Sequence, residues 1–219
     1  MEIRSKKQLE MCLSKVKPFL KPKVSKEQYM TPVDIASEVL WKAYYNNDIE
    51  NKVIADLGCG TGIFGIGALL LGARKIIFID IDEDALNLAK ENVSELYISD
   101  RSNSDEALEK CEFILTDISM IDNLKQKIDT CITNPPFGTK KKNEDNIFLL
   151  KAFDIAKTTY SFHKTITNDY IVNLAKRQGK QLGEQFKFRW MLANTMKYHM
   201  KKREYIDVSA YLFRSNGNE

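Results

Sequence analysis

Short apolar runs alternate with amphipathic stretches along most of this chain of 219 residues. The runs are rich in β-branched and aromatic residues, which is typical of strands buried on both faces of a parallel sheet. Between most of them, apolar positions recur every three to four residues, which indicates helices. Strands are predicted at 53–56, 75–80, 111–116, 127–133 and 158–162. This alternation predicts an α/β fold.

The two ends of the chain depart from this alternation. Residues 3–16 predict a short amphipathic helix, and a second helix is predicted to begin at Thr31 as N-cap and to run to about Tyr45. The stretch before it, 27–32, is either a capped helix entrance or a lid over a ligand site. Helices are also predicted at 145–158 and 165–177, a solvated loop at 99–110, and a turn between Gly179 and Gly183. Residues 186–192 and 206–213 alternate like an antiparallel pair.

Composition narrows the class of protein only a little. The chain is 43% hydrophobic and 29% charged, with a net charge of +3, which is ordinary for a globular protein. No signal-like segment or membrane-spanning run is predicted. The four cysteines are scattered and there are only two histidines, so a zinc site is not expected and a reducing compartment is: Cys12, Cys59, Cys111 and Cys131.

A glycine-rich turn follows the first predicted strand and leads into an apolar helix. Asp56 precedes three alternating glycines, Gly58, Gly60 and Gly62. Glycine admits positive φ and leaves no side chain between the backbone and a ligand. The free N–H groups at the start of the helix favour a bound group above the sheet. The spacing is not that of a dinucleotide-binding motif.

Acidic residues end the next two predicted strands. Asp80 lies twenty-two residues after Gly58, close to the offset of about 20 at which an acid accepts hydrogen bonds from ribose hydroxyls. Asp117 ends the following strand and is expected either to hold the exocyclic amine of a bound adenine or to cap the turn that it begins. These positions predict a nucleoside site.

A second motif, Asn134-Pro-Pro-Phe-Gly-Thr139, follows the fourth predicted strand. Pro135 and Pro136 carry carbonyl acceptors but no N–H donors, and Asn134 adds a side-chain carbonyl. Two such acceptors suit a planar exocyclic amine, whose lone pair they help to localise, while Phe137 stacks on the base. A nucleoside site beside this motif implies S-adenosylmethionine as methyl donor, because such an amine needs an electrophile held in line.

Three basic segments are candidates for contact with an RNA backbone. The alternative for each is a solvated loop or a satisfied surface histidine. One segment directly follows the acceptor motif, one ends the fifth strand, and one joins the closing pair: Lys140, Lys141 and Lys142; His163 and Lys164; and His199, Lys201, Lys202 and Arg203.

Five collinear motifs together resemble the eukaryotic methyltransferase-like protein five family of 18S ribosomal RNA adenine-N6 methyltransferases: Glu27-Gln-Tyr-Met-Thr31, Asp56-Leu-Gly-Cys-Gly-Thr-Gly62, Asp80-Ile-Asp-Glu-Asp-Ala-Leu86, Asn134-Pro-Pro-Phe-Gly-Thr-Lys140 and Tyr160-Ser-Phe-His-Lys164. The resemblance implies that Asn134 to Phe137 hold an adenine. It implies cofactor contacts, beside the turn residues Asp56 and Gly60, at Gln28, Thr31, Gly58, Thr61, Ile63, Asp80, Asp117 and Ile118. Thr61 departs from relatives that have cysteine there.

The resemblance further implies a seven-strand Rossmann-like sheet in the order 3-2-1-4-5-7-6, with the last strand antiparallel and an N-terminal helical extension. We expect one domain over 1–219, with the extension and lid at 1–50, the catalytic core at 51–214 and a polar tail at 215–219. A small zinc-binding activator protein is implied as partner, in a heterodimer through an edge strand from Cys111 to Thr116. The 18S rRNA substrate implies action in the nucleus (nucleolus) and cytoplasm.

Other functions fit the same motifs. Guanine N2 in RNA, adenine in DNA and a protein glutamine amide are also planar nitrogens. A non-catalytic RNA-binding module of this fold is another possibility, and the intact glycine, Asp80 and Asn134 signals count against it. The glycine spacing disfavours a nicotinamide-dependent oxidoreductase.

Overall fold

The computed structural model describes residues 2–99, 104–121, 124, 126–137, 144–191 and 205–215. Its helices are α1 (Lys6–Leu13), α2 (Val33–Tyr45), α3 (Ile63–Leu70), α4 (Glu83–Ser99), α5 (Ser104–Glu109), α6 (Glu144–Ile155) and α7 (Asn168–Arg177), with short 3-10 turns η1 (Val24–Lys26), η2 (Ile118–Met120) and η3 (Thr165–Thr167). Its strands are β1 (Val53–Leu57), β2 (Lys75–Asp80), β3 (Cys111–Leu115), β4 (Ile128–Thr133), β5 (Ala156–Lys164), β6 (Lys180–Met191) and β7 (Tyr205–Ser215).

The strands form one sheet of seven in the order β3-β2-β1-β4-β5-β7-β6, which confirms the predicted topology. From β3 to β5 every pair is parallel, and β7 runs antiparallel to both of its neighbours. Chain order reverses between β1 and β4, because β2 and β3 lie on one side of β1 and the later strands on the other. Open α/β sheets bind ligands at such a reversal, outside the carboxyl ends of the strands.

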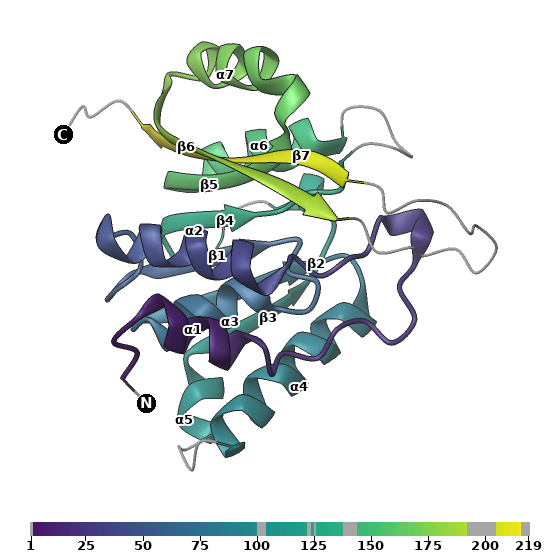
Figure 1. Ribbon diagram of the computed structural model, residues 1–219, viewed down its shortest axis with the longest axis vertical. Helices are drawn as coiled ribbons and strands as arrows, with labels where there is room; N and C mark the ends of the chain where they lie inside the picture. Colours follow the sequence, from purple (N-terminus) through teal and green to yellow (C-terminus); the bar gives the residue numbers. More distant parts are fainter. Residues whose placement is uncertain are drawn as a thin grey trace.

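Helices cover both faces of the sheet, so alternate residues of β1 enter different clusters. Ile54 packs in the cluster that also holds residues of α1 to α4, whereas Ala55 and Leu57 pack in the one that holds Ala152 of α6. Every residue of β1 is buried. This double burial explains why the strand is a continuous apolar run in the sequence rather than an alternating one. In Figure 1, α5 lies at the β3 end of the sheet and α7 at the β6 end.

Several elements differ locally from the predictions. The helix predicted at 145–158 ends at Ile155, and the strand predicted at 158–162 begins earlier, at Ala156. Part of the segment 99–110, predicted as a loop, is the helix α5, where Asp105 and Glu106 lie in the first turn and Ala107 packs in the core. The acids favour the N-terminus of this helix, and Ala107 and Leu108 pack on the core. Gly183 lies within β6 rather than in a turn, while Gly179 alone of the predicted pair has a positive φ, 68°.

Thr31 is not the side-chain cap of α2 that we predicted. The helix begins at Val33, Pro32 precedes it, and no side chain caps it. The Thr31 hydroxyl instead contacts the acceptor motif, as described below. Among the described residues, no helix is both long and apolar enough to cross a bilayer.

Helix α3 packs close to β2 because Gly65 has no side chain. A Cβ built at Gly65 lies 2.2 Å from Phe78 Cε1 and 2.6 Å from Phe78 Cζ. We expect Gly65→Ala to lower the free energy of unfolding by about 1–3 kcal/mol, since overpacking outweighs the gain in helix propensity. Urea unfolding measures this change. The control, Asn87→Ala on the exposed face of α4, should leave stability unchanged or raise it, and a Gly65→Ala protein as stable as the control would contradict this packing account.

Candidate active site

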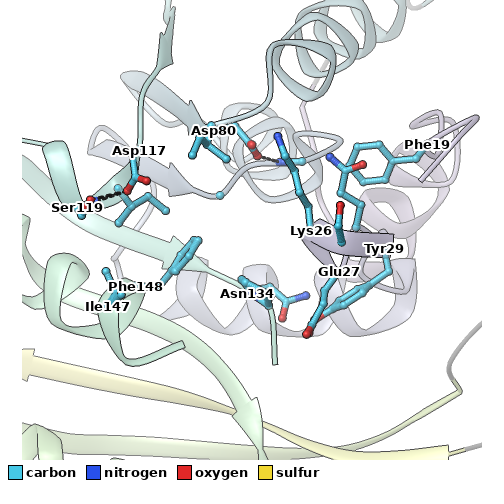
Figure 2. Close-up of a pocket in the computed structure, with 17 residues that line it drawn as sticks. Phe19, Lys26, Glu27, Tyr29, Asp80, Asp117, Ser119, Asn134, Ile147 and Phe148 are labelled. Atoms are coloured by element: carbon cyan, nitrogen blue, oxygen red, sulfur yellow. Dashed lines mark hydrogen bonds between the residues drawn. The ribbon is translucent and has the colours of Figure 1, made fainter. Parts of the chain in front are cut away.

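A pocket of about 380 Å³ opens at the carboxyl ends of the parallel strands, where the order of the sheet reverses (Figure 2). Its volume lies in the range of about 300–1,000 Å³ that is usual for small-molecule sites. Its walls come from the segment before α2, from the ends of β1 to β4 and from α6. The residues that line it are Phe19, Ser25, Lys26, Glu27, Gln28, Tyr29, Gly58, Gly60, Asp80, Ile81, Asp117, Ile118, Ser119, Asn134, Pro136, Ile147 and Phe148.

The glycine turn forms the floor of this pocket. Gly58 and Gly60 have φ angles of 71° and 53°, which disfavour any side chain. A Cβ at Gly58 would lie 2.6 Å from Phe148 Cε1. The Gly58 and Cys59 N–H groups both donate to Ile79 O, at 2.8 and 3.0 Å, and so join the turn to the end of β2. An aromatic ring therefore lies over each glycine, Phe148 over Gly58 and Phe19 over Gly60, where a Cβ would lie 3.2 Å from Phe19 Cζ.

Asp80 ends β2 and faces the pocket. Its Oδ2 accepts a hydrogen bond from Gly60 N and its Oδ1 one from Asp82 N, both at 2.9 Å. Burial raises the pKa of Asp80, although these two N–H donors and the nearby Lys26 act in the opposite direction. A carboxylate has about four acceptor positions, so two donors leave capacity for further hydrogen bonds. The geometry suits a ligand with two adjacent hydroxyls, such as a ribose.

Asp117 has the capping contacts that we offered as its alternative role. Its Oδ1 accepts from Ser119 N at 2.8 Å and from Ser119 Oγ at 2.6 Å, which caps the turn η2. Asp117 and Ile118 also line the pocket, so their contact with a cofactor stays a prediction. Ile118 and Phe148 supply apolar surface on which a planar ring can pack.

The segment 17–31, which we call the strap, supplies the wall opposite the sheet. Gln28 Nε2 donates to Asp82 Oδ2 at 2.7 Å, and Lys23 Nζ contacts Asp82 Oδ1 at 2.7 Å. Lys23 N donates to Gln28 Oε1 at 2.9 Å. These bonds join the strap to Asp82, two residues after Asp80. Residues 25–29 line the pocket, as the lid hypothesis requires.

Asn134 directly follows β4 and lies beside the strap (Figure 2). Its Nδ2 donates to Thr31 Oγ1 at 3.0 Å, which fixes the orientation of the amide. Its Oδ1 is buried and has no hydrogen-bond partner. A buried acceptor without a partner is costly, and the cost is removed when a ligand supplies an N–H group. Thr31 was predicted as a cofactor contact. It contacts Asn134 instead and is not among the residues that line the pocket.

Phe137 does not offer the open stacking face that we predicted. Its ring is 9% exposed. It stacks on Tyr29, with ring centroids 5.6 Å apart and planes 28° apart, and lies edge-on to Trp190 at 5.9 Å. Tyr29 Oη also donates to Pro135 O at 3.3 Å. In this arrangement of the strap, Tyr29 covers the ring of Phe137 and one of the two acceptor carbonyls. Stacking of a base on Phe137 stays a prediction.

Three residues implied as cofactor contacts have side chains buried in the protein. Asp56 is 1% exposed and accepts from Gly65 N at 2.8 Å. Thr61 is 2% exposed, and its carbonyl accepts from Asn92 Nδ2 at 3.0 Å. Ile63 packs in the core. Their side chains support the turn, and any contact that their backbone makes with a cofactor stays a prediction.

Of the predicted RNA contacts, Lys140, Lys141, Lys142, His199, Lys201, Lys202 and Arg203 lie outside the described residues. His163 is wrong as an RNA contact, because it is fully buried. Its Nε2 lies 2.8 Å from Ser161 Oγ and its Nδ1 3.3 Å from Asp145 Oδ2, and burial lowers its pKa. Lys164, at the end of β5, is partly exposed and stays a predicted RNA contact.

Several lining residues escaped the sequence reasoning. Phe19, Ile147 and Phe148 look like ordinary core positions of amphipathic helices or a proline-bounded loop, and only the fold turns them toward the pocket. Lys26 and Ser119 likewise carry no motif. Asp80 has acceptor capacity left for two hydroxyls, and Asn134 Oδ1 has no partner. With the apolar lining residues, they fit a cofactor that carries an adenosine, next to a base that carries an amine.

The chain matches the family model of the methyltransferase small domain over residues 29–201 and therefore belongs to that family. It is a methyltransferase, and its cofactor is S-adenosyl-L-methionine. Within this class it belongs to the methyltransferase-like protein five family. The zebrafish rRNA N(6)-adenosine-methyltransferase METTL5 is 37% identical over 94% of this chain and 97% of its own length.

Archaeal proteins are similar over the same extent. An uncharacterized protein of Methanocaldococcus jannaschii is 34% identical, over 95% of this chain and 93% of its own. A crystal structure from Pyrococcus horikoshii, of a protein named for a suggested RNA methyltransferase activity, superimposes with a TM-score of 0.82 at 38% identity. The match covers 96% of this chain and 98% of that chain.

Burial of Asp56 makes the free energy of unfolding depend on pH. Burial raises its pKa from 3.8 to about 8. A carboxyl whose pKa is raised on folding stabilises the protein at low pH, and this stability is lost as the pH rises from about 4 toward 8, by at most ~1.4 kcal/mol per pH unit. Asp56→Asn cannot ionise. Its free energy of unfolding should therefore rise relative to that of the wild type between pH 5 and pH 8.

Urea unfolding at a series of pH values measures this difference. The control is Asn87→Ala on the exposed face of α4, which changes no ionisable group and should differ from the wild type by an amount that does not depend on pH. A constant difference for Asp56→Asn as well would mean that the carboxyl titrates normally in the folded chain.

Proposed function

We propose that this enzyme transfers a methyl group from S-adenosylmethionine to the N6 amine of an adenosine in 18S ribosomal RNA. The observation that carries the proposal is Asn134 Oδ1, a buried acceptor without a protein partner in the pocket that Asp80 also lines. The names of the zebrafish, fly and worm relatives, all rRNA N6-adenosine-methyltransferases, support the substrate.

Asn134 and Pro135 would act on the amine by hydrogen bonding. The lone pair of N6 is delocalised into the adenine ring, which makes N6 a poor nucleophile. Acceptance of its two N–H groups by Asn134 Oδ1 and the Pro135 carbonyl favours a pyramidal nitrogen with a localised lone pair. Because Thr31 holds Asn134 Nδ2, the amide presents its oxygen, rather than its nitrogen, to the base.

Bound S-adenosylmethionine supplies an electrophilic methyl group on a sulfonium. Asn134 and Pro135 would hold N6 so that its lone pair faces this methyl group. The methyl would pass to N6 as the sulfonium became a thioether, and the proton that N6 then loses would go to water. No strong base is required. The protein's contribution is to align the methyl group with N6. In well-aligned reactions such positioning lowers the barrier by at most about 7–11 kcal/mol.

The alternative planar nitrogens are guanine N2, adenine in DNA and a glutamine amide. Guanine N2 and glutamine amides carry the same N–H donors, so Asn134 alone does not separate them. The names of the METTL5 relatives favour adenosine in rRNA. The aromatic cluster of Phe137, Tyr29 and Trp190 favours a flat base over an aliphatic amide.

We also propose that β3 binds a small zinc-binding activator protein, in a heterodimer. β3 is one of the two edge strands of the sheet, and none of its residues is fully buried. Leu115 at its end is 54% exposed, and Met120 in the following turn is 72% exposed. An edge strand with exposed apolar side chains favours pairing with another chain. We propose the nucleolus and cytoplasm, where ribosomal subunits are made and used, as the sites of action.

Asn134→Ala tests the role of the amide. We expect it to lower kcat by about 100-fold or more, the effect of removing one preorganised hydrogen-bonding group in an active site. Its affinity for S-adenosylmethionine, measured by calorimetry, should stay close to that of the wild type because Asp80 and the glycine turn are untouched. Asn87→Ala, on the exposed face of α4, is the matched control.

The assay uses small-subunit rRNA and a labelled methyl donor, with and without a zinc-binding activator. Nuclease digestion and mass spectrometry identify the product. Label in N6-methyladenosine supports the proposal, and label in N2-methylguanosine, in DNA or in protein would replace it. An Asn134→Ala enzyme that turns over at the wild-type rate would refute the proposed amine geometry.

A charge on β3 tests the proposed partner surface. Leu115→Asp should weaken binding of the activator about 10-fold or more, since it places a carboxylate in an apolar interface. Calorimetry on the purified pair measures the affinity. Ile166→Asp is the control, because Ile166 is 91% exposed on η3, near the opposite edge of the sheet. Equal binding by Leu115→Asp and the wild type would place the partner elsewhere.

A further inference from the structure

We propose that Tyr29 is an internal substitute for the substrate base: it occupies the place of the base on Phe137 and Pro135, and the base must displace it. The proposal rests on the proposed function, because the displacing ligand is the acceptor base. Tyr29 would then position the base and determine which base enters, although it lies in the strap and outside the acceptor motif 134–137.

Tyr29 makes two of the contacts expected of an adenine, with Phe137 and with Pro135, and leaves Asn134 Oδ1 unpaired. Its ring stacks on Phe137 at a centroid distance of 5.6 Å. Its hydroxyl donates to the Pro135 carbonyl at 3.3 Å, where an N6–H group would donate. Burial raises the pKa of Tyr29 well above its ordinary value, so the hydroxyl keeps its proton and acts as a donor. Figure 2 shows Tyr29 beside Asn134 at one end of the pocket.

Tyr29 and a base cannot both stack on Phe137 as it stands. Phe137 is 9% exposed, with Tyr29 over it and the edge of Trp190 against it. Tyr29 itself lies edge-on to Trp190, with centroids 5.2 Å apart. Stacking needs a free aromatic face. Tyr29 must therefore leave before a base can reach Phe137.

The strap is built so that Tyr29 can move without loss of the other contacts. Glu27, two residues before it, has a φ of 48°, a left-handed conformation that is unfavourable for a residue with a side chain. The hydroxyl bond to Pro135 is long, at 3.3 Å, and therefore weak. Gln28 and Thr31 on either side keep their own partners, Asp82 and Asn134. A rotation of the Tyr29 side chain breaks only its own contacts and frees the face of Phe137.

The base is also selected by its hydrogen-bond donor, because an N–H of the base must replace the Tyr29 O–H. The phenol O–H leaves a carbonyl acceptor that an amine N–H satisfies. A base that presents a carbonyl oxygen at this position would place an acceptor against the Pro135 and Asn134 oxygens and would leave all of them unpaired. Unpaired buried polar groups oppose binding. Entry of a base with an exocyclic amine is thereby favoured over entry of uracil.

Steady-state kinetics on small-subunit rRNA tests the displacement. Tyr29→Phe keeps the ring but loses the hydroxyl bond to Pro135, so a base competes with a weaker internal contact. We expect KM for RNA to fall about 2- to 10-fold, the range for one net hydrogen bond, with kcat little changed. Tyr170→Phe is the matched control, since it loses one hydroxyl bond, to Asn146, in a part of α7 outside the pocket lining. Its KM should stay at the wild-type value.

A second measurement needs no variant. Nitration of tyrosines by tetranitromethane, mapped by peptide mass spectrometry, reports whether Tyr29 is accessible. With S-adenosylhomocysteine and small-subunit rRNA bound, nitration of Tyr29 should rise several-fold over that in the free protein. Tyr45, which is 67% exposed, serves as the internal reference.

The outcomes separate the two proposals. A wild-type chain that methylates no adenine in RNA overturns the proposed function and this inference together. An active wild type with a raised or unchanged KM in Tyr29→Phe overturns this inference alone, because Tyr29 would then be a wall of the base site or irrelevant to it. Unchanged or stronger protection of Tyr29 from nitration in the complex does the same.

Discussion

The pairing of β1 with β4 is the contact on which the site depends. Leu57 lies opposite Thr133, and Thr133 Oγ1 donates to Leu57 O at 2.8 Å. The next residue of each strand is therefore Gly58 on one side and Asn134 on the other, which brings the cofactor turn and the acceptor amide to one pocket. Both faces of these strands are buried, so a slip of one residue would exchange the two hydrophobic faces. The register is fixed by the core, and the position of the active site follows from it.

The strap completes the site from a distant part of the sequence. It orients Asn134 through Thr31 and contacts Asp82 through Gln28, and at the same time it covers Phe137 with Tyr29. The same segment thus fixes the Asn134 amide in one orientation and buries the ring of Phe137. In the proposals above, the Asn134 amide holds the amine of the base, and Tyr29 covers the place that the base would take.

The features that could be predicted from sequence are the positions of residues at the carboxyl ends of the strands. Parallel strands bring their carboxyl ends to one edge, so Asp80, Gly58 and Asn134 could be placed together without knowledge of any side-chain contact. The features that failed depend on packing between segments far apart in the chain. His163 looks like a surface residue next to a lysine, yet the antiparallel pairing of β5 with β7 and the start of α6 bury it. Phe137 looks like an open stacking ring, yet Tyr29, more than a hundred residues earlier, covers it. Helix α5 was missed because its two core contacts, Ala107 and Leu108, are adjacent and give no periodic signal.

A crystal structure of the protein with S-adenosylhomocysteine tests the central claim most directly, which is that one pocket at the β1–β4 reversal holds the cofactor next to the acceptor amide. The account predicts ribose hydroxyls hydrogen-bonded to Asp80, the adenine ring between Ile118 and Phe148, and the sulfur directed toward Asn134 Oδ1. A cofactor bound elsewhere, or one whose sulfur faces away from Asn134, would contradict it.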